Sequence, residues 1–218
     1  GPPAWLDEAP PVTDAWEPAG EPAPSPPQPP GDEIAGLDWE ALAYRVAHCE
    51  ACELHRTRTH TVFGVGDRSA DLMLIGEAPG AEEDRKGEPF VGRAGQLLDA
   101  MLRAMGLGRE QVFIANILKC RPPGNRDPRP EEVVRCEPYL RRQVALVGPR
   151  VILALGRVAA QNLLKSQEPV GRLRGKSHRL DGIPVVVTYH PAYLLRSPEQ
   201  KGRAWQDLQR ALALMRGE

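Results

Sequence analysis

The segment LMLIGEAPG at residues 72–80 joins a continuous apolar run to a turn that contains two glycines and a proline. Residues 112–115, 151–155 and 185–187 are apolar runs of the same kind, and each is followed by a polar residue or a glycine. A short, continuous apolar run is typical of a strand that is buried on both faces of a mainly parallel sheet. The sequence therefore predicts four such strands.

Helical patterns separate these strands. Between residues 94 and 105, apolar side chains recur at intervals of three and four residues, and Gly106 is a natural stop. Strands that alternate with helices in this way form an α/β fold. We expect a three-layer α/β/α sandwich around a central four-stranded, mainly parallel sheet.

Three other helices have expected boundaries. One runs from near Leu37 to Cys49, and another begins at Pro130 and ends before Pro138, because proline removes an internal hydrogen bond. The last helix is expected to begin with a capping box at residues 197–200. Its buried face is expected to contain Trp205, Leu208, Leu212 and Met215.

The net charge of −1 conceals two parts of opposite sign. Residues 1–44 hold nine acidic and no basic side chains, whereas residues 45–218 hold 28 basic and 20 acidic ones, so the charges are −9 and +8. A basic body favours a polyanionic partner such as nucleic acid. No apolar run is long enough to cross a membrane, and no secretory signal pattern opens the chain. We expect a monomer with a cytoplasmic, nucleoid-associated location and no membrane contact.

The first part of the chain is rich in proline, with eleven prolines in the first 30 residues. A segment with so few large apolar side chains cannot bury enough surface to offset the entropy lost on folding. We therefore expect a disordered acidic arm at residues 1–36 and one folded domain at residues 37–218. Trp5, Leu6 and Trp16 form a candidate docking motif for a partner that the sequence does not identify, and a solvated tail is the alternative.

Polar residues follow the expected strands at one edge of the sheet. Gly76 and Glu77 follow the first strand, Asn116 the second and His190 the fourth. Ligands of open parallel sheets bind beyond the carboxyl ends of the strands. The sequence therefore predicts a ligand site at this edge.

The chain has four cysteines, Cys49, Cys52, Cys120 and Cys136. The first two form a CxxC motif, whose short turn can direct two sulfur atoms at one ion or cluster. Disulfides are not expected in an intracellular chain of this size. Four thiolates suit a tetrahedral zinc ion or a [4Fe–4S] cluster, and free buried cysteines are the third alternative.

Six motifs in this order resemble the family 4 uracil-DNA glycosylases, the iron–sulfur branch of that superfamily. The motifs are CEAC at 49–52, GEAPGAEED at 76–84, GEPFVG at 87–92, NILKCRPP at 116–123, Cys136, and HPAYLLR at 190–196. The resemblance covers residues 37–218 and leaves out the arm.

The resemblance implies a DNA base-excision repair enzyme. Such an enzyme flips uracil out of DNA and hydrolyses its N-glycosidic bond, which leaves an abasic site. The resemblance also implies uracil-containing DNA as the partner and a structural [4Fe–4S] cluster on the four cysteines, with zinc as the runner-up. The alternatives are a non-enzymatic, cluster-stabilised DNA-binding module and a related glycosylase that acts on another deaminated base.

The resemblance and the chemistry of the reaction together give candidate roles to five side chains. Phe90 is the expected stacking face, and Asn116 can accept from uracil N3–H and donate to O4. His190 is the expected donor to uracil O2 as the base leaves. Glu77 is the candidate that positions water and supports the cationic sugar, and Glu83 is the second carboxylate within reach.

Other motif residues are expected to contact the DNA. Gly76 and Ala78 allow close approach of the backbone to the flipped nucleotide. The loop at residues 193–196 resembles the one that fills the space left by a flipped base. It offers Leu194 and Leu195 as wedges, and Tyr193 and Arg196 as contacts. The candidate phosphate contacts are Lys119, Arg121, Arg126, Arg157, Arg172, Arg174 and Lys176.

Two features set the chain apart from covalently cross-linking relatives. It lacks their arginine-rich insertion that ends in a nucleophilic histidine, since residues 121–128 read RPPGNRDP. It also has Ala78 where those relatives carry a glutamine. Ordinary turnover is therefore expected.

Overall fold

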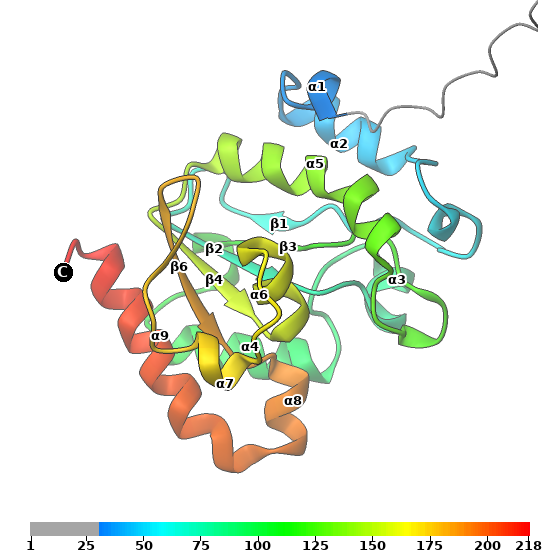
Figure 1. Cartoon of the computed structure of the whole chain (residues 1–218). Helices are drawn as coiled ribbons and strands as arrows, with labels where there is room; N and C mark the ends of the chain where they lie inside the picture. The colour runs from blue at the N-terminus through cyan, green and yellow to red at the C-terminus, as the bar shows by residue number, and fades with distance from the viewer. Residues whose placement is uncertain (1–30) are drawn as a thin grey trace, which may run out of the picture.

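The computed structural model describes residues 31–218. Its centre is a six-stranded sheet with the strand order β1-β3-β2-β4-β6-β5 (Figure 1). The strands are β1 (Val65–Gly66), β2 (Leu72–Gly76), β3 (Phe113–Asn116), β4 (Val151–Leu155), β5 (His178–Leu180) and β6 (Ile183–Thr188).

The four strands predicted from the apolar runs are β2, β3, β4 and β6, and they pair in parallel. The α/β class and the mainly parallel centre are therefore confirmed. The expected count of four strands was too low, because β1 and β5 add to the two edges in antiparallel orientation. Both edge strands are short and at most half-buried, so they lack the apolar pattern of the central strands.

Helices cover both faces of the sheet and form the expected three layers (Figure 1). Met73 and Ile75 of β2 face a core shared with α2, α5 and α6, whereas Leu72 and Leu74 face a core shared with α4 and α9. The helices are α1 (Gly31–Ile34), α2 (Trp39–Ala47), α3 (Ala81–Lys86), α4 (Arg93–Ala104), α5 (Pro130–Val147), α6 (Arg157–Leu164), α7 (Val170–Leu173), α8 (Pro191–Arg196) and α9 (Lys201–Met215). Short 3₁₀ turns η2 (Glu53–Arg56), η3 (Arg109–Gln111), η4 (Pro123–Asn125) and η5 (Pro198–Gln200) lie in the connections.

The expected end of the helix before Pro138 was wrong. α5 runs from Pro130 to Val147 and contains Pro138 in its interior. An internal proline costs a helix about 3 kcal/mol. Side chains on both sides of it, among them Val133, Leu140 and Val144, are buried against the sheet. This packing outweighs the lost hydrogen bond.

The expected start and buried face of the last helix were also partly wrong. α9 begins at Lys201 after the turn η5, and the side chain of Ser197 makes no capping bond. Leu208 is buried, but Trp205 is 38% exposed. Leu212 and Met215 are partly buried against the core as expected, and Ala204, Asp207 and Ala211 complete the buried face.

The packed body begins before residue 37. α1 packs against α5, and Ile34 is fully buried. Residues 1–30, with Trp5, Leu6 and Trp16, lie outside the described residues, so the disordered arm and its docking motif stay predictions. Within residues 31–218, no helix combines the length and the apolar character needed to cross a membrane.

Candidate active site

A pocket of about 200 Å³ opens beyond the carboxyl ends of β2 and β3, at the predicted edge of the sheet. It brings together Phe90, Asn116 and His190, which come from three separate parts of the sequence. We call it the Asn116 pocket. Its lining consists of Ala78, Ala81, Glu82, Glu83, Phe90, Gly92, Arg93, Ala94, Gly95, Asn116 and His190.

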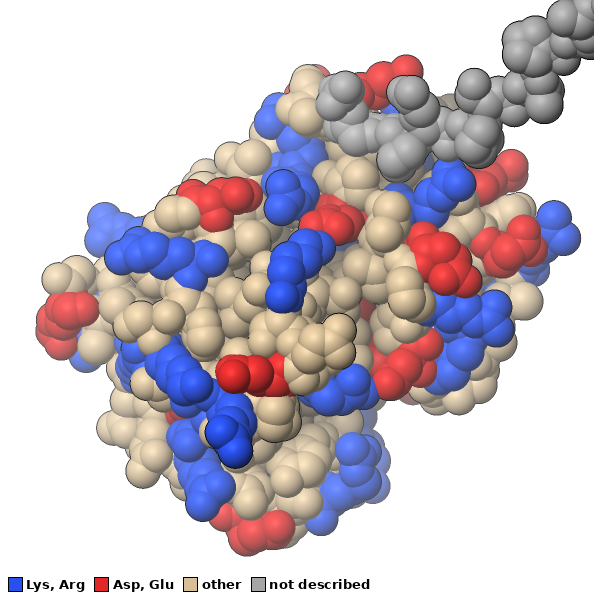
Figure 2. All heavy atoms as spheres, viewed as in Figure 1, with Lys and Arg blue, Asp and Glu red and all other residues tan. Residues whose placement is uncertain are grey.

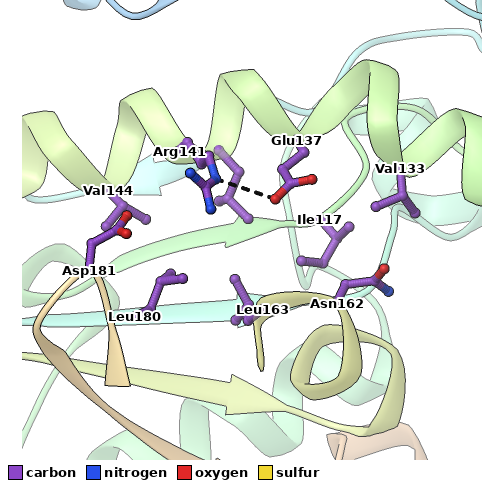
Figure 3. A pocket seen from close by; sticks show the side chains of 10 residues that line it. Ile117, Val133, Glu137, Arg141, Val144, Asn162, Leu163, Leu180 and Asp181 are labelled. Atoms are coloured by element: carbon purple, nitrogen blue, oxygen red, sulfur yellow. Dashed lines mark hydrogen bonds and ion pairs between the residues drawn. The ribbon is translucent and has the colours of Figure 1, made fainter. Parts of the chain in front are cut away.

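A second hollow lies between α5, α6 and the β5–β6 hairpin (Figure 3). Apolar side chains such as Ile117 and Leu163 line it, and Glu137 pairs with Arg141 on its α5 side. Its volume of about 20 Å³ is close to the space that a single water molecule needs. This hollow is too small for a nucleobase.

Phe90 forms one wall of the Asn116 pocket. Its ring lies nearly parallel to that of His190, with centroids 5.5 Å apart and planes at 29°. A Cβ atom at position 76 would lie 2.7 Å from the Phe90 ring and 2.6 Å from Asn116 Oδ1. Gly76 is therefore needed for the two side chains to lie where they do.

Asn116 ends β3 and is 3% exposed. Among the residues that the structure describes, its Oδ1 is the one buried side-chain nitrogen or oxygen atom without a hydrogen-bond partner. Such an orphan acceptor costs about 1–3 kcal/mol, so it points to a donor supplied by a ligand.

His190 is the N-cap residue of α8, and its Nδ1 accepts a hydrogen bond from the Ala192 N–H at 3.0 Å. This contact requires an unprotonated Nδ1, so the proton of the neutral ring is on Nε2. Burial lowers the pKa of His190 to about 4, and the positive charge of Arg196 contributes to the lowering. The neutral ring is therefore an Nε2–H donor at neutral pH.

The two candidate carboxylates differ in their contacts. Glu83 accepts from the Gly80 N–H at 3.2 Å and from the Val91 N–H at 3.3 Å, so it ties the loop after β2 to the loop that carries Phe90. Glu77 follows β2 directly, is half-buried and, unlike Glu83, is not among the residues that line the Asn116 pocket. Burial is the main cause that raises the pKa of Glu77. The Asp127 carboxylate raises it further, and Arg157 lowers it in part.

All four cysteines line one further pocket, which we call the cysteine pocket. Three of their sulfur atoms accept hydrogen bonds from other side chains or from the backbone. Tyr139 Oη donates to Cys49 at 3.0 Å, and the Lys119 N–H donates to Cys136 at 3.3 Å. Arg58 donates to Cys120 at 3.4 Å and to the Cys49 carbonyl at 2.6 Å.

The thiols of the cysteine pocket are unlike free surface thiols. Burial raises the pKa of Cys120 to about 11 and that of Cys136 to about 12. Within residues 31–218, no group of three or more His, Cys, Asp or Glu side chains is arranged to hold a metal ion. All four thiols nevertheless line the same pocket.

Comparisons with known proteins agree with this geometry. The family model described as Uracil DNA glycosylase superfamily matches residues 63–209. The chain belongs to the uracil-DNA glycosylase superfamily. The type-4 uracil-DNA glycosylase of Archaeoglobus fulgidus is 47% identical over 166 residues, which cover 72% of this chain and 83% of that protein. That of Thermotoga maritima is 42% identical over 183 residues, 82% of this chain and 95% of that protein.

The resemblance to the type-4 branch is therefore confirmed. The type-5 uracil-DNA glycosylase of Pyrobaculum aerophilum is less similar, with 34% identity over 146 residues, 59% of this chain and 64% of that protein. The pocket also lies at the edge of the sheet that was predicted from the polar residues after the strands.

Residues 193–196, expected to form a loop, belong to the helix α8, and one of their two leucines is exposed. Leu195 is 38% exposed, and Arg196 is exposed as well. Leu194 is buried among Tyr189 and Ala204 instead, so the expectation that both leucines act as wedges is corrected. Tyr193 stacks on Tyr189 with centroids 5.2 Å apart and supports α8 from within.

The expected phosphate contact at Lys119 was wrong. Lys119 is 1% exposed, and its Nζ donates to the Phe63 carbonyl at 3.1 Å and to Gln143 Oε1 at 2.6 Å. Buried carboxylates hold the guanidinium groups of two other candidates, Arg126 and Arg174. Figure 2 shows basic side chains gathered over the part of this face that α7 and α9 occupy in Figure 1. Arg172 and Lys176 are exposed there.

Sequence reasoning missed several residues that organise the site. Tyr139 lies one turn after Cys136 on α5, but the expected helix end at Pro138 concealed this i, i+3 relation. Asp84 is buried, and its Oδ1 accepts from the Thr59 and His60 N–H groups at 2.8 and 3.3 Å. These bonds tie α3 to the loop after the CxxC motif. The sequence carried no pattern that pointed to this long-range contact.

Proposed function

We propose that this chain is a DNA repair enzyme that removes uracil from DNA by hydrolysis of the N-glycosidic bond. The observation that carries the proposal is the Asn116 pocket, in which a stacking ring, an orphan amide oxygen and a neutral imidazole donor face one space. These are the three groups needed to hold a flipped base, read its edge and stabilise its departure.

Asn116 supplies the recognition of uracil. Its Oδ1 accepts from uracil N3–H, and its amide donates to O4, while Phe90 stacks on the ring. Cytosine reverses the donor and acceptor on that edge, so both amide groups would be mispaired at about 1–3 kcal/mol each. The lack of a partner for Oδ1 supports this role.

His190 supports the departure of the base. Bond cleavage leaves negative charge on the uracil, and the Nε2–H donates to O2. A preorganised donor of this kind contributes about 3–4 kcal/mol. Because the pKa of His190 is about 4, the ring acts as a neutral hydrogen-bond donor and gives up no proton.

Glu77 is the carboxylate that positions water and stabilises the cationic sugar. The transition state resembles an oxocarbenium ion, as in other glycoside hydrolyses. The contacts of Glu83 favour Glu77, since both Glu83 oxygens already accept backbone hydrogen bonds. Glu83 instead shapes the two loops that form the wall of the pocket.

The end of α8 at residues 193–196 and the exposed basic side chains bind the DNA. Val170 of α7 and Tyr193 of α8 pack against the same small cluster of Tyr189, Leu194 and Ala204, and Leu195 and Arg196 of α8 are exposed. Leu195 fills the space left by the flipped base, and Arg196 contacts the backbone.

The cysteine pocket fits a [4Fe–4S] cluster. Four thiolates are the usual ligands of such a cluster, and hydrogen bonds to the sulfur atoms are typical of its surroundings. Cys49, Cys52, Cys120 and Cys136 would hold the cluster, which would join the chain near Cys49 to the segment after Asn116. Its contribution would be structural, because base hydrolysis transfers no electrons.

The test of the function uses two matched oligonucleotides, one with uracil and one with thymine at the same position. After incubation with the protein, alkali cleaves any abasic site. We expect scission of the uracil strand alone. Binding of DNA without uracil-dependent scission would instead favour a non-enzymatic DNA-binding module. Elemental analysis should find iron, whereas zinc would overturn the cluster.

A further inference from the structure

Phe90 has a backbone conformation that its side chain does not favour. Its φ of +53° lies in the left-handed region, where a bulky residue is an outlier. Such strain persists only where the surrounding structure enforces it. The side chain that makes this wall of the Asn116 pocket is therefore held in place by something outside its own local sequence.

One arginine holds the backbone on both sides of this strained position. Arg109 Nη2 donates to the Pro89 carbonyl at 2.6 Å, and Nη1 donates to the Phe90 carbonyl at 3.0 Å. Nη1 also donates to Asp99 Oδ1 of α4 at 3.1 Å, which fixes the guanidinium plane. Arg109 begins the turn η3 and lies outside all six motifs of the sequence.

Close packing on the other side leaves the Phe90 backbone little freedom. A Cβ atom at Gly95, in the first turn of α4, would lie 1.8 Å from the Phe90 carbonyl oxygen. The ring itself packs against Gly76 and His190. The carbonyl therefore lies against α4, and the fork of the guanidinium matches the pair of neighbouring carbonyls in a way that a single ammonium group cannot.

We propose that Arg109, oriented by Asp99, is a positioning residue that holds Phe90 in the conformation in which its ring stacks on the flipped base. The inference rests on the proposed function. Arg109 itself touches neither the base nor the sugar. Its effect on excision passes through the ring of Phe90.

The test compares Arg109→Met with Arg142→Met. Arg142 is a matched control, because its Nε donates to the Leu37 carbonyl at 2.7 Å, away from the Asn116 pocket. We expect Arg109→Met to lower kcat/KM on uracil DNA and to weaken inhibition by free uracil, each about 10-fold, the scale of one base–aromatic stack. Arg142→Met should leave the inhibition constant unchanged, and Arg109→Lys should recover part of the loss through one carbonyl.

A double-mutant cycle separates positioning from general stabilisation. In a Phe90→Ala background, Arg109→Met should cause no further loss of kcat/KM, because no ring is left to position. Losses that add, or an Arg109→Met protein that binds free uracil as tightly as Arg142→Met, would overturn the inference. If Arg109→Met does not fold, Arg109→Lys is used in the same cycle. A wild-type protein without uracil-dependent scission would overturn the proposed function instead.

Discussion

The Asn116 pocket and the cysteine pocket differ in whether their buried polar groups have hydrogen-bond partners within the protein. In the Asn116 pocket, an amide oxygen is buried without a partner and a phenylalanine has a positive φ. Around the cysteine pocket, the buried Lys119 donates to two oxygen atoms, and three of the four sulfur atoms accept hydrogen bonds. The first region keeps features that are unfavourable in the free protein, whereas the second satisfies its polar groups internally.

This difference fits the proposed function, in which the Asn116 pocket binds the base and the cysteine pocket supports the site. Unpaired buried polar atoms and strained backbone usually occur where a ligand completes the interactions. They are usually absent where a region only stabilises the fold. Changes in the Asn116 pocket should therefore affect uracil excision more than stability. Changes around the cysteine pocket should affect stability first.

The largest effect on excision is expected from Glu77→Gln. Loss of a general base lowers the rate about 10²–10⁴-fold. Burial raises the pKa of Glu77, and the ionised form is the active one, so kcat/KM of the wild type should fall as the pH drops through that raised value. This acid limb should lie above the ordinary glutamate value of 4.5. It should be missing from the remaining activity of Glu77→Gln, and an unchanged limb would assign it to another group.

The next largest effect is expected from Asn116→Ala. Two hydrogen bonds to the base are lost, which should lower kcat/KM about 100-fold. The melting temperature should stay the same or rise, because the change removes a buried oxygen without a partner. Thermal unfolding and steady-state kinetics on one preparation measure both. A large drop in stability would show that Asn116 is a structural residue.

Cys120→Ser should reduce stability and activity together. The variant loses one of the four thiolates, and with it the link between the CxxC segment and the segment after Asn116. We expect a loss of iron, a lower melting temperature and a lower kcat/KM, measured by elemental analysis, thermal unfolding and the oligonucleotide assay. A stable, iron-free and fully active variant would contradict the supporting role of the cysteine pocket.

The smallest effect on excision is expected from Gln143→Ala. Gln143 accepts from Lys119 and donates to the Phe63 carbonyl at 2.8 Å, and it is fully buried. Its loss leaves a buried cation with one partner fewer, so the free energy of unfolding should fall by about 1–3 kcal/mol. Below the unfolding transition, kcat/KM should match that of the wild type. A loss of excision without a loss of stability would contradict the claim that changes around the cysteine pocket affect stability first.

Several features of the site could be predicted because their signals are local. Asn116 and His190 each follow a continuous apolar run, and parallel pairing places the ends of such runs at one edge. The buried Leu194 and the exposed Leu195 could not be told apart, because both are leucines in one short helix and only the packing of α8 against α4 and Ala204 decides which is covered. Lys119 was misread for a similar reason. The charge of a lysine predicts solvent exposure, but the fold encloses Lys119 between Phe63 and Gln143.

The sequence by itself determined the central strands and the edge at which the pocket lies, and it named Asn116 and His190 as residues at that edge. Each of these depends on the order of residues within a few positions of one another. The tertiary structure alone decided that α5 continues through Pro138, that Glu83 is occupied by backbone hydrogen bonds, and that Arg109 lies against the carbonyls of Pro89 and Phe90. These outcomes depend on contacts between segments far apart in the chain, and a short stretch of sequence does not reveal such contacts.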